Sequence, residues 1–557
     1  MAFIVKKNIS GKDYYYLNET KRVGGKVVSK CLAYLGKDKK DAENKAKEII
    51  EKREEKQEKG EILKEEGNGK LKPQKISVED LATFCKRKGF VYPSAEIYGG
   101  IAGFFDYGHL GVELKNNIKQ NWWDFHVRQR EDIVGIDGSI ITNPEVWKAS
   151  GHVESFSDIF VVCKKCKKIN KIDKNELGKV KCEFCGGNYD EDKAKEFKLM
   201  FKTTIGEEGF AFLRPETAQL IFTNFKFVQD NARLKLPFGI AQIGKSFRNE
   251  IAPRDFLFRL REFEQMEIEY FADPKEKCPY KIGNNKILVY SEEMQKKNQE
   301  PLKIKFKEAY DKKVINSDWI AYWLEQEFSW FINLGANPEK FRIRQHVSDE
   351  KSHYAVDTWD LEYNFPFGWK ELQGLANRGD YDLRQHQTHS KTNLEVKDNK
   401  DEKILPHVVC EPSQGVERAL LVFLFDAYHY DKKRDNIILK LNSRLAPIKA
   451  AILPIVKKPE FEKISKQICD NLKTEFNVVQ DKSGSIGRRY ARNDEIGTPY
   501  CITIDGDSFK NKDVTVRIRD TAEQVRIKIE FLKGALREAI NGRDIKEFGK
   551  LIDTRNK

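Results

Sequence analysis

The stretch from residue 239 to 271, GIAQIGKSFRNEIAPRDFLFRLREFEQMEIEYF, most constrains the fold of this chain. Its alternation of apolar and polar residues predicts two β-strands joined by an arginine-rich loop. In the second strand Met266, Ile268 and Tyr270 form an apolar face, which can pack on helices. The opposite face is unusually polar and consists of Phe263, Gln265, Glu267 and Glu269.

The residue types of this hairpin allow two interpretations. A hairpin with a solvated charged face is the ordinary one. However, Arg248 and Glu250 continue the polar face of the first strand, and the loop adds three further arginines before Phe263. Such a set can serve a nucleotide, because arginine binds phosphate bidentately, a carboxylate accepts from the adenine amino group, and a phenyl ring stacks on the base.

The bulk properties of the chain limit its class. Its 557 residues are too many for one core, so about two to four domains are expected. The net charge of +13 favours a polyanionic partner, although a lysine-rich surface can also reflect composition alone. The longest apolar run, ALLVFLF at 419–425, is too short to span a bilayer, and the N-terminus lacks an apolar signal segment. The mostly scattered cysteines indicate a reducing compartment, so we expect a cytoplasmic protein without membrane association.

Several motifs together resemble one enzyme family. FRNE (247–250) followed by Arg259 and Phe263 is similar to motif 2 of class II aminoacyl-tRNA synthetases, and the longer run to residue 271 resembles its glycyl-tRNA synthetase version. RPETAQ (214–219), EPSQGVER (411–418, motif 3) and a segment ending in Asn143-Pro144 (motif 1) match the same family. The resemblance spans residues 78 to 545. It implies glycine-tRNA ligase activity with ATP, Mg2+, glycine and tRNA(Gly) as cofactors and partners, and a homodimer.

Residues 1–74 lie outside the resemblance. Their pattern predicts a basic N-terminal extension with two or three short strands, a charged helix from about residue 41 to 66 and a linker. This extension either contacts RNA or is a solvated appendage.

The fold expected from the resemblance is α+β. Residues 75–442 form an antiparallel class II catalytic sheet flanked by helices, with a zinc ribbon at 163–190 and a helical insertion at 273–340. The alternating β and α pattern of 443–557 predicts a compact α/β domain, which resembles the anticodon-binding domain of the glycyl, prolyl, threonyl and histidyl enzymes.

The resemblance implies which residues bind ATP. Arg248, Glu250 and Arg418 carry catalysis: Arg248 bridges the α-phosphate, Glu250 accepts from adenine, and Arg418 holds a phosphate or the second face of the base. Arg418 also stands in the first turn of the motif 3 helix, where a cation opposes the macrodipole. The full ATP-binding set is Arg248, Asn249, Glu250, Phe258, Arg259, Leu260, Arg261, Glu262, Phe263, Glu371, Leu372, Gly415 and Arg418. Glu371 and Glu411 are expected near Mg2+.

Glycine has no side chain to recognise, so an acidic, tight pocket is expected to hold its ammonium group and exclude larger amino acids. The implied glycine-binding set is Glu216, Phe263, Glu264, Gln265, Met266, Glu267, Glu411, Ser413, Gly415 and Lys171. Lys171 stands where the family carries an arginine. His346 and His353 are expected to be solvated or core histidines rather than metal ligands.

Two C-x-x-C knuckles, CKKC and CEFC, lie fifteen residues apart. Four thiolates at this spacing favour a structural Zn2+ site, against disulfides or chance, and leave no open position for catalysis. The expected ligands are Cys163, Cys166, Cys182 and Cys185.

In the C-terminal domain the expected anticodon contacts are Arg488, Arg489, Arg492 and Arg517, and the alternative is a generic basic surface. Two other functions remain open: an accessory protein that uses a synthetase fold to bind nucleic acid, and a class II synthetase of the threonyl, prolyl or seryl type. The presence of Arg248, Glu250, Glu267 and Arg418 argues against the first, and the combined motifs argue against the second.

Overall fold

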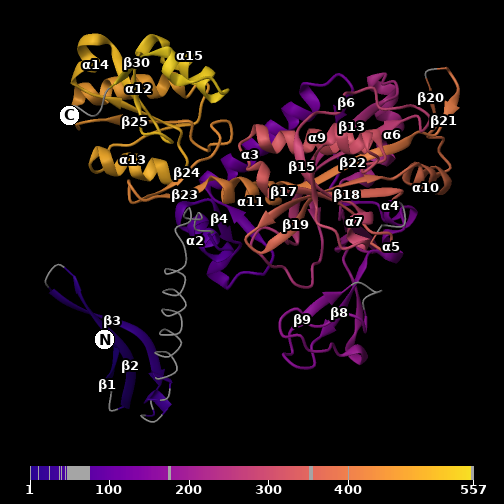
Figure 1. The fold of residues 1–557 in the computed structure, drawn as a ribbon, viewed down its shortest axis with the longest axis horizontal. Coiled ribbons are helices and arrows are strands. Elements are labelled where there is room, and N and C mark those ends of the chain that lie inside the picture. Colours follow the sequence, from indigo (N-terminus) through magenta and orange to yellow (C-terminus); the bar gives the residue numbers. More distant parts are fainter. Residues whose placement is uncertain are drawn as a thin grey trace. The chain divides into compact units, whose positions relative to one another are not determined.

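The computed structural model describes residues 76–172, 177–350, 355–398 and 400–552, together with 2–9, 12–23, 26–36, 38, 41–43 and 45–46 (Figure 1). The chain divides into two compact units, Met1–Lys75 and Ile76–Lys557. Among the described residues, no helix combines the length and the apolar character that a membrane span requires.

The N-terminal unit is an antiparallel meander of β1 (Ala2–Ile9), β2 (Lys12–Val23) and β3 (Lys26–Gly36). Its small core consists of Tyr15, Leu17, Leu35, Ala42 and Ala46. The strands are those that the sequence predicts. Apart from residues 41–43 and 45–46, the expected charged helix lies outside the described residues.

A large sheet is the centre of the second unit, and helices pack on the apolar side chains of its strands. Its strands in spatial order are β16 (Leu302–Lys305), β15 (Lys286–Tyr290), β17 (Phe341–Gln345), β18 (Asp357–Phe365), β19 (Gly368–Asn377), β22 (His407–Gly415), β14 (Glu262–Ala272), β13 (Phe238–Phe247) and β6 (Ile133–Gly135). All neighbours pair antiparallel except β15 with β17 and β13 with β6. The sheet therefore has the mainly antiparallel form expected for a class II catalytic domain.

Helices pack against both faces of this sheet. The main core joins α3 (His109–Trp123), α9 (Asp318–Asn333) and α11 (Val416–Ala427) to the apolar side of the strands, including Met266, Ile268 and Tyr270 of β14. A smaller core holds α6 (Ala218–Ala232) and α10 (Tyr381–Ser390). The region 273–340 is only partly helical: it supplies α7 (Glu292–Lys296), α8 (Phe306–Asp311) and α9, but also β15 and β16 at the sheet edge. β15 has the sequence KILVY with Ile287 and Val289 buried, and β16 has the alternating sequence LKIK with Ile304 buried.

Shorter elements precede the central hairpin. They are α2 (Val78–Lys88), β4 (Val91–Pro93), β5 (Phe105–Tyr107), β7 (Ile141–Thr142), α4 (Pro144–Ala149), α5 (His152–Ser155), β8 (Ser157–Val162), β9 (Ile169–Ile172), β10 (Lys195–Lys198), β11 (Lys202–Ile205) and β12 (Gly209–Leu213). The proline that ends motif 1 begins α4, whose N-cap Asn143 accepts from the Glu145 N–H. β8, β9 and β10 form a small separate sheet that carries the cysteine knuckles.

The C-terminal part is the α/β domain that the sequence predicts. Its six strands lie in the order β26 (Val478–Gln480), β25 (Ala450–Pro454), β27 (Tyr500–Ile504), β28 (Asp513–Ile518), β29 (Gln524–Lys528) and β30 (Lys550–Ile552). They pack with α12 (Pro459–Leu472), α13 (Ile486–Glu495), α14 (Gly506–Asn511) and α15 (Ile529–Ile540). Before them come the β20 (Val396–Lys397)–β21 (Lys403–Ile404) ribbon and the hairpin of β23 (Tyr428–Asp431) and β24 (Asn436–Leu439).

Candidate active site

The β13–β14 hairpin forms the floor of a cavity. Its register places Gln242 opposite Glu267, and Ser246 opposite Phe263. β22 continues the same row, with Ser413 opposite Glu267, and Gly374 of β19 follows opposite Ser413. Because strand neighbours in one row point to the same side, the polar residues of three strands converge on one face.

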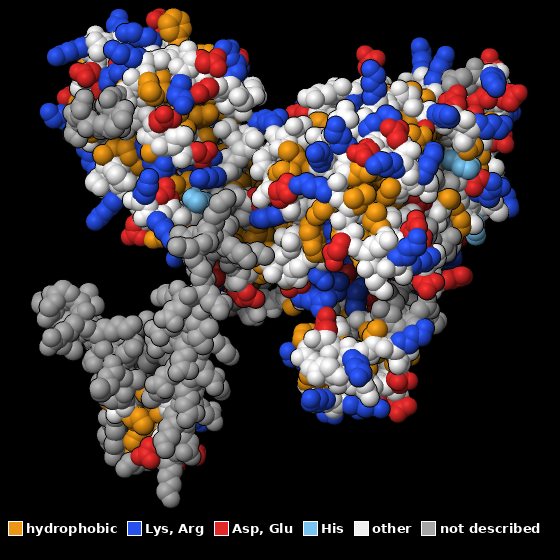
Figure 2. Space-filling view, viewed as in Figure 1, with side chains coloured by type: hydrophobic (Ala, Val, Ile, Leu, Met, Phe, Trp, Pro, Cys, Tyr) orange, Lys and Arg blue, Asp and Glu red, His pale blue; other side chains and the backbone are white. Residues whose placement is uncertain are grey.

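This cavity has a volume of about 400 Å³. The residues predicted for ATP or glycine that line it are Lys171, Glu216, Arg248, Glu250, Phe258, Arg259, Leu260, Phe263, Gln265, Glu267, Glu371, Leu372, Glu411, Ser413, Gly415 and Arg418. They come from segments as far apart as residues 171 and 418, and the sheet brings them together. Figure 2 shows Lys and Arg side chains gathered in the hollow beside the small sheet of β8 and β9.

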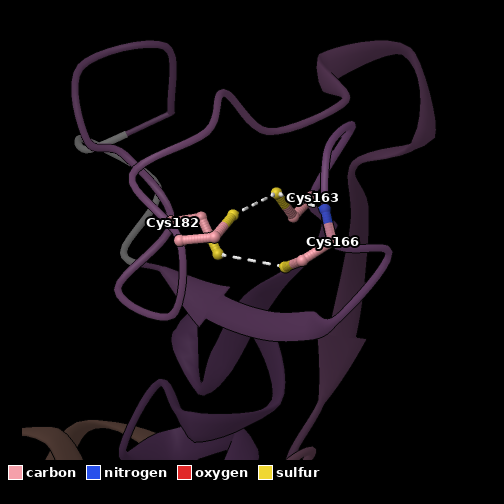
Figure 3. A group of neighbouring side chains, drawn as sticks. Cys163, Cys166 and Cys182 are labelled. Atoms are coloured by element: carbon pink, nitrogen blue, oxygen red, sulfur yellow. Dashed lines mark hydrogen bonds between the residues drawn. The ribbon is translucent and has the colours of Figure 1, made fainter. Parts of the chain in front are cut away.

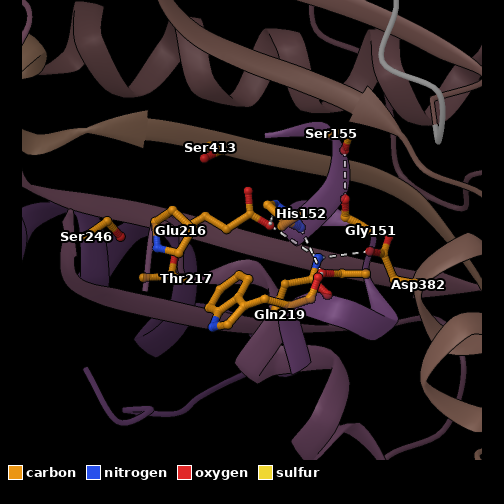
Figure 4. Close-up of polar contacts among 12 residues, drawn as sticks. Gly151, His152, Ser155, Glu216, Thr217, Gln219, Ser246, Asp382 and Ser413 are labelled. Carbon is orange, nitrogen blue, oxygen red and sulfur yellow. Dashed lines mark hydrogen bonds and ion pairs between the residues drawn. The ribbon is translucent and has the colours of Figure 1, made fainter. Parts of the chain in front are cut away.

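One end of the cavity is acidic. Glu216 precedes α6 and lies 3.3 Å from His152 Nε2, and Gln219 donates to it at 3.2 Å (Figure 4). Glu267 is 1% exposed and accepts from the Thr217 hydroxyl. Glu411 accepts from Arg378 at 2.8 Å. Three carboxylates, of which Glu267 and Glu411 are buried, favour a positively charged ligand.

The pKa values of these carboxyls differ because their partners differ. Burial by itself raises the pKa of Glu216, but His152, Arg378 and Arg248 hold it well below its ordinary value. Burial and the charge of Glu216 raise the pKa of Glu267. Burial raises the pKa of Glu411 to about 8, against the lowering effect of Arg378. A positively charged group bound beside these carboxyls would favour their ionised forms.

The other end of the cavity is arginine-rich. Arg248 donates to the Pro215 carbonyl at 3.0 Å, and its guanidinium lies 5.3 Å from the centre of the Phe263 ring. Arg418, in the first turn of α11, donates to Glu371 Oε1 at 3.0 Å and lies 4.6 Å from the Phe258 ring centre. The charge of Arg418 lowers the pKa of Glu371. Two guanidiniums and two aromatic rings around one space suit a nucleotide base and its phosphates.

Glu250 supplies a direct test of whether ATP fits. It is 9% exposed, and its Oε2 atom has no hydrogen-bond partner. The nearest cations, Lys171 and Arg259, lie at 4.0 Å from that oxygen. A buried acceptor without a donor is costly, and an adenine amino group is a donor of the required kind. The residues present therefore fit ATP.

Five predicted residues do not line this cavity. Asn249 donates from its backbone to Leu199, and the Arg261 side chain donates to the carbonyls of Glu250 and Ala102. Glu262 pairs with Lys245, Glu264 pairs with Lys115 and Lys119, and Met266 is fully buried in the core. Strand alternation explains these positions: Glu262, Glu264 and Met266 point away from the face that carries Gln265 and Glu267. Their side chains are corrected to structural roles.

The structure also places residues at the site that the sequence did not single out. They are His152, Asp360, Arg378 and Glu417. Asp360 lines the cavity together with His346, whose Nε2 atom lies 2.8 Å from the Asp360 carboxylate; His353 lies outside the described residues. Arg378 is 2% exposed and also binds Asp382 bidentately at 2.7 and 2.9 Å. Only the tertiary fold joins these positions.

The four cysteines of the two knuckles meet in space (Figure 3). Cys163 Sγ lies 3.5 Å from Cys185 Sγ, and Cys166 Sγ lies 3.6 Å from Cys182 Sγ. All four sulfur atoms lie within 4.8 Å of one another. Tetrahedral zinc with Zn–S bonds of about 2.3 Å separates its sulfurs by about 3.8 Å, so the donor set fits Zn2+.

The predicted anticodon arginines divide into two groups. Arg488 is exposed on α13, and Arg492 binds Asp481 while remaining partly exposed. Arg489 is 3% exposed and donates to the Pro454 carbonyl at 2.7 Å. Arg517 is buried in a bidentate pair with Asp494. Arg489 and Arg517 are therefore corrected to structural roles, because both side chains are buried and bind acceptors inside the domain.

The mainly antiparallel sheet, the arginine and carboxylate cavity and the appended α/β domain define a class II aminoacyl-tRNA synthetase. Residues 449–539 match the family model of the anticodon binding domain. A solved prolyl-tRNA synthetase from Cryptosporidium parvum has a similar fold, with a TM-score of 0.53, 15% identity, and coverage of 86% of this chain and 80% of that chain.

Curated relatives identify the family within this class. Glycine--tRNA ligases of Caldanaerobacter subterraneus subsp. tengcongensis and Acetivibrio thermocellus are 42% and 43% identical, over 84% and 82% of this chain and 99% and 97% of their own lengths. The enzyme of Thermobifida fusca is 41% identical over 84% of this chain. The chain belongs to the glycine--tRNA ligase family, and is an ATP-dependent ligase.

Proposed function

We propose that this cavity activates glycine with ATP and then transfers it to the 3′ end of tRNA(Gly), with the site residues in the roles given below. The supporting observation is the division of one cavity into an acidic end, with Glu216, Glu267 and Glu411, and a cationic end, with Arg248 and Arg418. An amino acid carries an ammonium group beside a carboxylate, so the two ends match its two charges and place the carboxylate toward ATP.

In the first step the glycine carboxylate attacks the α-phosphorus of ATP and pyrophosphate leaves. The attacking group is already an anion, so the step requires positioning and charge neutralisation rather than a general base. Arg248 neutralises the α-phosphate and the carboxylate that attacks it. Phe263 stacks on adenine, Glu250 accepts from its amino group, and Arg259 and Arg418 hold the outer phosphates and the second face of the base.

Bound Mg2+ supplies further neutralisation of the phosphates. Glu371 is exposed on the cavity wall and is our proposed ligand. Glu411 is better placed for the ammonium group, because it lies deep beside Glu267 and Arg378. In the second step the terminal ribose hydroxyl of tRNA attacks the carbonyl carbon of the glycyl-adenylate, and AMP leaves.

Glycine specificity is proposed to come from the acidic end. Glu216, Glu267 and Glu411 surround the ammonium group, and Ser413 donates a hydrogen bond to the bound amino acid. A side chain larger than hydrogen would displace one of these groups. Buried carboxylates left without a donor would weaken binding of such a substrate. This loss of binding free energy is larger than the one a missing methylene causes, so the proposal needs no separate editing site.

We also propose a structural Zn2+ held by Cys163, Cys166, Cys182 and Cys185, a homodimer, and a cytoplasmic location. The dimer is supported by a group of exposed apolar side chains between α2 and α3: Ile97, Tyr98 and Ile101 are 88%, 87% and 67% exposed. Exposed apolar clusters of this kind are typical of interfaces. Light scattering during gel filtration should give twice the chain mass of 64.8 kDa; the monomer mass would contradict the dimer.

The proposed function is tested by charging. Purified enzyme with ATP and Mg2+ should attach labelled glycine to tRNA(Gly) and not to tRNA(Ala). Labelled alanine and serine are the matched control substrates, because each differs from glycine only by a small side chain. Charging of tRNA(Gly) with alanine at a rate comparable to glycine would contradict the proposed pocket.

A further inference from the structure

A cluster of charged side chains that neither chemical step uses joins the catalytic and anticodon-binding domains. The hairpin of β23 and β24 directly follows α11, the helix that carries Arg418, and its turn contains Arg434. β24 packs against α13 of the C-terminal domain (Figure 1). The hairpin therefore connects an ATP-site helix to the helix that carries Arg488 and Arg492.

Arg434 reaches across this boundary. Its Nη1 donates to the Arg519 carbonyl at 2.6 Å and lies 3.3 Å from Asp494 Oδ2, and its Nη2 donates to the Asp520 carbonyl at 3.3 Å. Within the turn, the Asp431 side chain accepts from the backbone N–H of Arg434 at 3.2 Å. The backbone of Arg434 is thus held by its own hairpin, and its guanidinium binds groups of the C-terminal domain.

Asp494 is the shared acceptor. It is 1% exposed, and Arg517 donates to both of its oxygens at 2.8 and 2.9 Å. A buried carboxylate held by one guanidinium from each domain allows one arrangement, because removing either cation leaves a desolvated charge with too few donors. We call Arg434, Asp494 and Arg517 the clasp.

Other contacts follow the same boundary. Asn436 of β24 donates to the Ala491 carbonyl of α13 at 3.0 Å, and Lys88 at the end of α2 pairs with Glu495. At its opposite end α13 begins after the N-cap Ser485, close to the exposed Arg488. One end of α13 is therefore docked on the catalytic domain, and the other is free to meet RNA.

We propose that the clasp fixes the orientation of the anticodon-binding domain so that one tRNA reaches the anticodon site and the catalytic cavity together. The proposal rests on tRNA being the substrate. A ligand bound at two sites gains from an effective concentration that falls when the geometry between the sites is lost. Arg434 is accordingly a positioning residue for tRNA and contacts neither glycine nor ATP.

The test compares two RNA substrates of the full-length enzyme. Full-length tRNA(Gly) spans both sites, whereas a minihelix of its acceptor stem reaches only the cavity. Arg434→Ala should lower kcat/KM for full-length tRNA at least about tenfold and leave minihelix charging and glycine-dependent ATP–pyrophosphate exchange within about twofold. Asp494→Asn should give the same pattern, and the double variant should be little worse than either single variant, because both changes break one unit.

Arg537→Ala is the matched control. Arg537 lies in the same C-terminal domain and pairs with Glu475 on the surface, so its loss should change charging of neither RNA. An equal loss for tRNA and minihelix, or no loss for Arg434→Ala, would overturn the clasp. Unchanged exchange confirms that the catalytic domain of the variant is folded. A wild-type enzyme that charges neither RNA with glycine would instead contradict the proposed function.

Discussion

At the residue scale, the proposed glycine pocket depends on carboxylates that repel one another. Glu267 and Glu411 both have raised pKa values because of burial and the neighbouring Glu216 charge. Thr217 and Arg378 offset this repulsion only in part. We therefore expect a bound ammonium group to relieve the remaining repulsion.

Removing Glu267 should weaken glycine specifically. A hydrogen bond to a charged group contributes about 1.5–3 kcal/mol, so Glu267→Ala should raise KM for glycine about 10–150-fold, with KM for ATP little changed. Steady-state ATP–pyrophosphate exchange measures both constants. Glu264→Gln is the matched control on the same strand, because Glu264 pairs with lysines outside the cavity. An unchanged KM for glycine in Glu267→Ala would remove Glu267 from the pocket.

Glycine binding should also release a proton. Burial raises the pKa of Glu411 to about 8, and the ammonium group requires the ionised form. Affinity should therefore rise with pH, by up to about tenfold per unit below pH 8, and level off above it. Calorimetric titration with glycine in buffers of different ionisation enthalpy counts the proton directly. Identical heats in all buffers would exclude this linkage, and Glu411→Gln should abolish it.

At the scale of elements, the small sheet of β8, β9 and β10 contacts the loop between β13 and β14. Lys171 of β9 lies 4.0 Å from Glu250, and Glu183 of the second knuckle pairs with Arg254 of the loop. The four cysteine sulfurs of the two knuckles lie within 4.8 Å of one another. We therefore expect the loop proposed to contact ATP to depend on an element that contributes little of the cavity itself.

Loss of the metal site should reduce ATP binding. Cys182→Ser should lower bound zinc, measured by elemental analysis, from about one ion per chain, and raise KM for ATP several-fold, because the ribbon would no longer hold Lys171 and Glu183 beside the loop. KM for glycine should change less. Cys469→Ser, at a buried cysteine of α12, is the control. Full zinc content in Cys182→Ser would contradict the four-cysteine site.

Strand alternation explains how much of these elements the sequence predicts. The polar and apolar faces of β14 follow from their period of two, and the structure confirms them for Gln265, Glu267, Met266 and Ile268. Arg489 and Arg517 show the limit. A basic pattern does not reveal which guanidinium pairs with a buried carboxylate, because Asp494 and Arg517 lie on different elements. His152 and Arg378 likewise reach the pocket only through the tertiary fold.

At the scale of the whole molecule, this chain is longer than its match to its relatives. The relative from Caldanaerobacter aligns over 99% of its own length with 84% of this chain. Residues 76–557 form a compact unit of their own, and the candidate active-site cavity lies in that unit. We therefore expect residues 76–557 to carry the catalytic function.

A chain of residues 76–557 should keep ATP–pyrophosphate exchange within about twofold of the full chain, since the cavity lies wholly in that unit. Charging of tRNA by the shortened chain and by the full chain is then compared at low and at high salt. The difference between the two chains measures what the basic extension adds, because contacts to phosphates weaken with salt. A loss of exchange greater than about tenfold would show that residues 1–75 support the catalytic unit.

The central claim is that one cavity holds ATP at its arginine end and only the smallest amino acid at its acidic end. ATP–pyrophosphate exchange measured with each of the twenty amino acids tests this directly. The structure predicts rapid exchange with glycine and exchange at least about a hundredfold slower with alanine, serine and all larger amino acids. Comparable exchange with alanine, or none with glycine, would contradict it.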